Sequence, residues 1–163
     1  DAKMPSDLSH YELPEFLDSD TKSRLLQIGL SLKDDDWTVH KSTRTGKPSV
    51  LNFYDLNMTF HGRNCYLLMI RPQAIQDWHT DGGRRNTALI YPLSENYAPC
   101  SFEQGQTDRP MFLNTQSKHA VFNNDEKRIN LNISFEEDID DCIEFFKCLK
   151  FFKGNTAYEF DPS

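Results

Sequence analysis

Three side chains that can bind a metal ion, and one cation after them, occur in an order that suits chemistry at a metal centre. His79 and Asp81 are separated by one residue, so in an extended segment both side chains point the same way. His119 comes much later and must be brought alongside by another strand. Two imidazoles and one carboxylate can hold non-haem iron(II) and leave positions open for other ligands. Arg128, nine positions after His119, can clamp a carboxylate with its forked guanidinium.

The segment that carries Arg128 alternates strictly between polar and apolar residues, which is typical of a strand. Its apolar positions are Ile129, Leu131, Ile133 and Phe135. We expect that face to pack in a core between two sheets. The opposite face then presents Arg128, Asn130 and Asn132 as a polar row at the mouth of a barrel.

Short apolar runs separated by turn residues follow one another from Trp37 onward, which indicates many short strands. We expect strands at 37–44, 50–60, 65–71, 78–83, 87–93, 100–104, 111–114, 119–123 and 128–135. The run 65–71 is dense in apolar residues and should be buried on both faces. A helix is expected from Lys22 to Lys33 and another over about 136–153. The pattern predicts a mainly β fold for residues 1–163 as a single domain, with a sandwich or barrel-like core over about 37–135 and flanking N-terminal and C-terminal helices.

The composition narrows the classes of partner. The net charge of -7 argues against a broad nucleic-acid-binding surface, because such affinity comes from clustered Lys and Arg. The longest wholly apolar stretch, Leu67 to Ile70, is too short to cross a membrane, and no signal peptide is visible. The four cysteines lack metal-binding or redox spacing, and we expect free thiols in a reducing cytoplasm. They are Cys65, Cys100, Cys142 and Cys148.

The order HxD, distal His and Arg resembles the motif of Fe(II)/2-oxoglutarate-dependent dioxygenases. The strings WHTDG (78–82), TALIYPL (87–93), HAVFNN (119–124) and RINLNISF (128–135) carry this resemblance. They are most similar to the prolyl-hydroxylase and aspartyl/asparaginyl-hydroxylase branch, in which an Arg follows the distal His at about this distance. The resemblance covers roughly Tyr66 to Phe135, about half of the chain.

The resemblance implies a fold, a metal site and a co-substrate. The fold would be a double-stranded β-helix, the jelly-roll or cupin-like core. Iron(II) would be held by His79, Asp81 and His119. 2-Oxoglutarate would chelate that iron, and Arg128 would bind its distal carboxylate.

Four further residues are candidates for contact with 2-oxoglutarate. Some branches of the family have Arg-x-Ser on the co-substrate strand, where this chain has Asn130, so Asn130 or Asn132 would replace that Ser. Tyr66, on the strand before the HxD motif, and Tyr91 compete for a tyrosine contact. For both tyrosines, packing in the core or at its rim is the alternative.

The implied reaction is hydroxylation of a prolyl or other amino-acid side chain, free or in a peptide, with O2 consumed and succinate and CO2 released. Ascorbate would serve as a supporting reductant. Arg84 and Arg85, just after the HxD motif, could hold an anionic substrate or the co-substrate, the alternative being exposed loop charges. Other readings of the whole chain are a non-catalytic jelly-roll binding module, a metal-dependent cupin enzyme without 2-oxoglutarate, and a nucleobase-directed dioxygenase of the same family. The cupin reading ranks lower because such sites usually have HxH rather than HxD.

Overall fold

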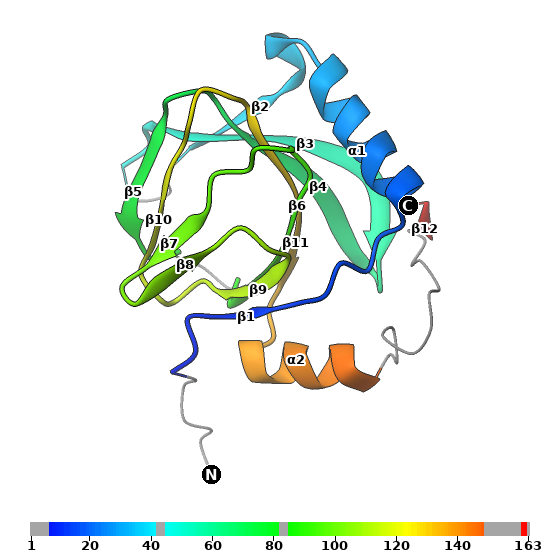
Figure 1. The fold of residues 1–163 in the computed structure, drawn as a ribbon, viewed down its shortest axis with the longest axis vertical. Helices are drawn as coiled ribbons and strands as arrows, with labels where there is room; N and C mark the ends of the chain where they lie inside the picture. Colours follow the sequence, from blue (N-terminus) through cyan, green and yellow to red (C-terminus); the bar gives the residue numbers. More distant parts are fainter. Residues whose placement is uncertain (1–6, 42–44, 82–84, 149–160, 163) are drawn as a thin grey trace.

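Two antiparallel β-sheets face each other and two helices lie outside them in the computed structural model of the chain (Figure 1). The structure describes residues 7–41, 45–81, 85–148 and 161–162. The helices are α1 (Ser19–Ser31) and α2 (Ile139–Cys148), with a short 3-10 helix η1 (Asp34–Asp36) after α1. The predicted mainly β fold with flanking helices is therefore confirmed.

The larger sheet has the strand order β1-β9-β6-β11-β4-β3-β12, and β2 pairs with β3. Its strands are β1 (His10–Glu12), β2 (Thr38–Lys41), β3 (Pro48–Phe60), β4 (Arg63–Ile70), β6 (Thr87–Pro92), β9 (Met111–Asn114), β11 (Arg128–Phe135) and β12 (Asp161–Pro162). The smaller sheet has the order β5-β10-β7-β8. Its strands are β5 (Ile75–His79), β7 (Cys100–Phe102), β8 (Gly105–Thr107) and β10 (His119–Phe122). From β4 to β11 the chain passes back and forth between the two sheets, which is the topology of a double-stranded β-helix.

Polar side chains begin both helices. The Asp18 carboxylate accepts a hydrogen bond from the Thr21 backbone N at 2.6 Å, so α1 begins earlier than the predicted Lys22. The Asp138 carboxylate accepts one from the Asp141 N at 2.9 Å, and α2 begins at Ile139 rather than near 136. The predicted end of this helix near 153 lies outside the described residues.

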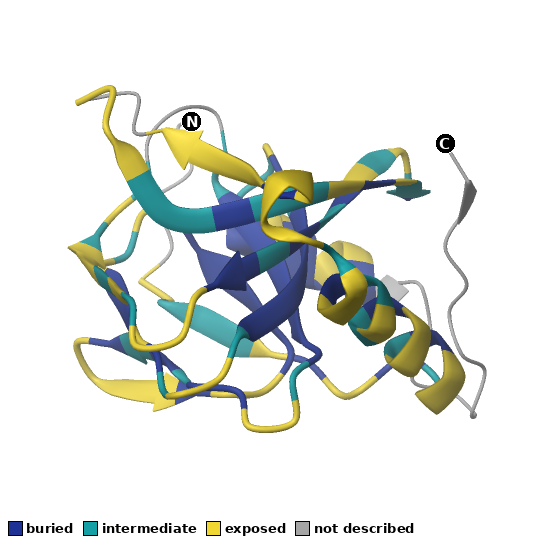
Figure 2. Cartoon of the chain, turned by 90° about the horizontal axis from the view of Figure 1, so that it is seen from above, coloured by how far each residue is buried: buried dark blue, intermediate teal, exposed yellow. Residues whose placement is uncertain are grey.

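The main core lies between the larger sheet and the helices, not between the two sheets. Ile129, Leu131 and Ile133 of β11 belong to one apolar cluster with Leu25 of α1 and Phe146 of α2. This corrects the expectation for β11, because its apolar face meets the helices and its polar row faces the other sheet. Figure 2 shows that the buried residues gather on the central strands, while the outward side of the helices is exposed.

A second, smaller apolar cluster fills part of the space between the sheets. It includes Ile70, Ile90 and Val121. The inward face of β4 is covered at Ile70 but only partly at Tyr66 and Leu68, so the expectation of burial on both faces is wrong for that stretch. Tyr66 and Leu68 are therefore only partly buried on this inward face.

The remaining differences from prediction concern short elements. Strands β1, β8 and β12 were not predicted, and the strand expected at 78–83 is Ile75–His79, so Asp81 lies beyond its end. No described helix combines the length and the apolar composition that a membrane crossing needs. Cys65, Cys100 and Cys142 are buried free thiols, as predicted, and the side chain of Cys148 lies outside the described part of the chain.

Candidate metal centre

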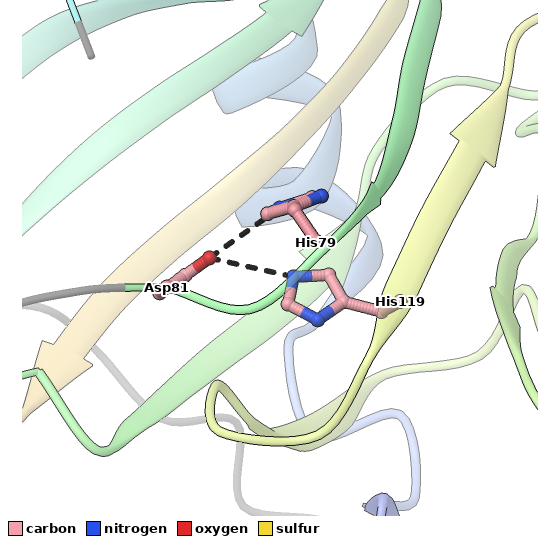
Figure 3. A group of neighbouring side chains, drawn as sticks. All are labelled: His79, Asp81 and His119. Carbon is pink, nitrogen blue, oxygen red and sulfur yellow. Dashed lines mark ion pairs between the residues drawn. The ribbon is translucent and has the colours of Figure 1, made fainter. Parts of the chain in front are cut away.

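His79, Asp81 and His119 come together at one end of the smaller sheet (Figure 3). His79 ends β5 and His119 begins β10, and the two are paired across the antiparallel strands. The Nε2 atoms of His79 and His119 lie 3.4 and 3.5 Å from the Asp81 Oδ1. Their ligand atoms all lie within 4.8 Å of one another. A single divalent cation can be reached by all three.

Backbone carbonyls orient both imidazoles. Nδ1 of His79 donates to the Asp77 O at 2.7 Å, and Nδ1 of His119 donates to the Ser117 O at 2.7 Å. A carbonyl only accepts, so each Nδ1 carries the hydrogen and, in the neutral ring, each Nε2 presents its lone pair toward Asp81. Such bonds to the remote nitrogen are the usual support of metal-binding histidines.

Asp81 is anchored although it lies outside a strand. Its backbone N donates to the Thr115 O at 2.8 Å, and the Gln116 amide approaches its carbonyl at 3.4 Å. Burial raises the pKa of the Asp81 carboxyl, but the two histidine rings, which can donate to it from Nε2 when protonated, and the charge of Arg85 outweigh this effect, so the pKa lies well below its ordinary value. The carboxylate is therefore charged at neutral pH, as a metal ligand must be.

Arg85 lies on the other side of the same carboxylate. Its Nη1 is 3.8 Å from the Asp81 Oδ2, while Oδ1 faces the histidines. Its Nη2 donates to the Asn132 Oδ1 at 3.1 Å. Burial lowers the pKa of Arg85, and the charge of Asp81 opposes that effect. Arg84 lies outside the described residues.

Arg128 is buried between the sheets and is firmly held. Only 5% of it is exposed, and its Nε donates to the Ala98 O at 2.8 Å. The guanidinium carbon lies 4.0 Å from the centre of the Tyr97 ring, a cation–π contact. The Tyr97 hydroxyl donates to the Asn130 Oδ1 at 3.1 Å. Burial raises the pKa of the nearby Cys100 thiol, while the charge of Arg128 lowers it and that of Asp81 raises it.

The two tyrosine candidates lie on opposite faces of the larger sheet. Tyr66 is paired with Asn132 across β4 and β11, so both side chains face the interior between the sheets. Tyr91 is paired with Leu131 and belongs to the outer core, where its hydroxyl accepts from the Leu17 N at 3.3 Å. This placement is a correction for Tyr91, because the sheet separates it from the candidate metal ligands.

Three residues near the centre were not singled out from the sequence. Tyr97 stacks on Arg128, Thr115 anchors the Asp81 segment, and the Gln76 amide lies 3.2 Å from the His79 Nε2. Gln76 is three positions before His79 on β5. In a regular strand, residues three apart point to opposite faces of the sheet, so the sequence pattern would not place Gln76 beside His79. Tyr97 and Thr115 lie outside strands, so no periodic signal marks them.

A cavity of about 370 Å³ opens elsewhere on the surface. It is lined by charged residues of both signs, among them Glu15, Lys22 and Arg109, and by none of the three candidate ligands. The acidic and basic side chains that line this cavity can pair with one another, and they do not form a metal-binding group like that of His79, Asp81 and His119.

Known structures share this fold. No family model and no curated protein matches the sequence. The chain is similar to a prolyl hydroxylase from Trichoplax adhaerens, solved with a peptide of the hypoxia-inducible factor oxygen degradation domain, with 14% identity, coverage of 87% of each chain and a TM-score of 0.61. It is also similar to a Pseudomonas putida prolyl-4-hydroxylase, with 13% identity, coverage of 78% of this chain and 91% of that one, and a TM-score of 0.56. A 2OG-Fe(II) oxygenase family oxidoreductase from Burkholderia pseudomallei matches with 8% identity, coverage of 81% and 86%, and a TM-score of 0.52. The chain therefore has the fold of these oxygenases, and its HxD and distal His side chains form one group within it.

Proposed function

We propose that this protein is an Fe(II)- and 2-oxoglutarate-dependent oxygenase that hydroxylates an amino-acid side chain. The observation that carries the proposal is the convergence of two Nε2 atoms and one carboxylate, from His79, His119 and Asp81. The buried guanidinium of Arg128 in the same barrel supports a dicarboxylate co-substrate beside the metal.

The donor set fits iron(II). Both imidazoles have their Nδ1 hydrogens occupied, Asp81 is ionised, and three ligands on one face leave the opposite face of an octahedron free. When bound, iron(II) with 2-oxoglutarate and O2 supplies the oxidation of an unactivated C–H bond, with succinate and CO2 as products.

The protein's own residues bind and orient. Arg128 receives the distal carboxylate of 2-oxoglutarate, and Tyr97 and the Ala98 carbonyl hold its guanidinium in one orientation. Asn130 accepts a hydrogen bond from the Tyr97 hydroxyl, and Tyr97 in turn packs on Arg128, so the role of Asn130 is to support the arginine through this tyrosine. Tyr66 and Asn132 lie on the same inner face and are the remaining candidates for contact with the co-substrate.

A prolyl or other amino-acid side chain, free or in a peptide, is the substrate class that we propose. The peptide-bound prolyl hydroxylase of the same fold supports a peptide or amino-acid substrate. The net charge of -7 weighs against a nucleobase in a nucleic acid. Cytoplasmic location and ascorbate as a supporting reductant are also part of the proposal, and the buried reduced thiols support the former.

The test is succinate formation that requires both iron(II) and 2-oxoglutarate, together with metal analysis of protein purified without chelator. His119→Ala and Asp81→Ala should abolish metal binding and turnover. His40→Ala is the matched control, because His40 is an exposed histidine of β2 outside the group. Bound metal without succinate formation would favour a non-catalytic module, and near-normal turnover by Asp81→Ala would refute the ligand assignment.

A further inference from the structure

Arg85 is a cation at the candidate centre to which the proposed chemistry gives no role. If the proposed function holds, iron(II), ionised Asp81, the 2-oxoglutarate dianion and Arg128 balance one another in formal charge. Arg85 is then the unbalanced positive charge in a partly buried site. An uncompensated charge in such surroundings is costly, so a further anion is favoured there.

The guanidinium of Arg85 has hydrogen-bond donors to spare. Nη2 bonds the Asn132 Oδ1, and Nη1 is 3.8 Å from the Asp81 Oδ2, too far for a hydrogen bond. Its Nε is buried and has no hydrogen-bond partner among the residues that the structure describes. A guanidinium carries five N–H donors, of which one is bonded to Asn132 here, and a carboxylate can accept two side by side.

Arg85 is also held in position, unlike a loop charge that is free to move in solvent. The Thr115 Oγ1 donates to the Arg85 carbonyl at 2.6 Å, and the Thr115 N donates to the Asn86 carbonyl at 3.2 Å. Thr115 is fully buried, and its own carbonyl accepts from the Asp81 N. Arg85 and Asp81 are therefore tied to the same residue, which fixes the cation beside the candidate metal ligands.

We propose that Arg85 binds a carboxylate of the primary substrate, and that Asn132 is the positioning residue that orients its guanidinium. The inference rests on the proposed function and narrows its substrate. The substrate class is then an amino acid or short peptide with a carboxylate close to the oxidised C–H bond. That carboxylate belongs either to the main chain of a free amino acid or to an acidic side chain.

Matched pairs of probes separate these sources. N-acetyl amino acids are compared with their carboxamides, and capped dipeptides that contain Asp are compared with the same dipeptides that contain Asn. The protein is loaded with manganese(II) and N-oxalylglycine, an unreactive analogue of 2-oxoglutarate. Relaxation of the probe protons by manganese(II) reports binding near the metal without any turnover, and zinc(II) serves as the diamagnetic reference.

For the wild type we expect at least one carboxylate probe to bind about tenfold or more tightly than its uncharged partner. Arg85→Gln should bring the two to equal affinity while the affinity for N-oxalylglycine stays within about twofold. Asn132→Asp should also remove the preference for the carboxylate probe with Arg85 retained, because the new carboxylate occupies the guanidinium. Arg109→Gln is the control, since it removes the same charge from an exposed site. Thermal unfolding checks that each variant is folded.

Three results would overturn the inference. One is a wild type that prefers no carboxylate over its partner, and another is an Arg85→Gln variant that keeps the preference. The third is an Arg85→Gln variant that loses N-oxalylglycine instead, which would make Arg85 part of the co-substrate site. If manganese(II) or N-oxalylglycine fails to bind the wild type, the proposed function fails, and the inference that rests on it falls with it.

Discussion

Replacement of Arg128 by Gln should weaken 2-oxoglutarate binding by at least about 100-fold. The side chain is 5% exposed, and its Nε is already bonded to the Ala98 carbonyl, so the co-substrate would bind through the Nη groups. Each hydrogen bond to a charged group contributes about 1.5–3 kcal/mol, so two lost bonds cost about 3–6 kcal/mol. Since 1.4 kcal/mol is a tenfold change, about 100-fold is the lower end of this range.

The assay is calorimetric titration of 2-oxoglutarate into zinc-loaded protein, with exposed Arg109→Gln as the matched control for charge. Arg128→Lys keeps the charge but not the fork and should fall between the wild type and Arg128→Gln. Loss of the bond to Ala98 and of the Tyr97 contact also lowers stability, by about 2–4 kcal/mol, so unfolding is measured in parallel. A folded Arg128→Gln protein that binds 2-oxoglutarate within about threefold of the wild type would refute the clamp.

The remaining predictions concern the core. Phe146→Ala should lower the free energy of unfolding in urea by about 3–5 kcal/mol, because this ring is 1% exposed. Phe145 is 38% exposed, so Phe145→Ala should lower it by less than about 1 kcal/mol. Similar losses in the two variants would contradict the packing of Phe146 in the core. Gly29→Ala should destabilise despite better helix propensity, since its Cβ would lie 3.1 Å from the Ile129 Cγ2; a higher Tm would show that Ile129 yields. Burial raises the pKa of Cys65 to about 12, so above about pH 9 the unfolded chain binds fewer protons and stability falls as pH rises. Cys65→Ala should show a shallower fall, and equal slopes would refute this cause.

Most of the strands along the chain and the candidate metal ligands could be predicted, because local patterns mark both. The strict alternation at 128–135 predicted β11 with the right bounds, and the HxD spacing with a distal His predicted the group that the structure brings together. Strands β1 and β8, each of three residues, have too few positions for any period to emerge. They are strands because they pair with β9 and β7.

The sequence by itself determined which side chains alternate along each strand, but it could not say which alternating set faces the metal. Only the pairing of β11 with β4 and β6 decided that Tyr66 lies inside the barrel and Tyr91 outside it. The physical reason is that a shift of one residue in register moves every side chain to the opposite face, and register depends on contacts between distant strands. The same holds for Arg85, which reads as a loop charge in the sequence. Its contact with Asn132 exists only because the fold brings β11 next to Arg85.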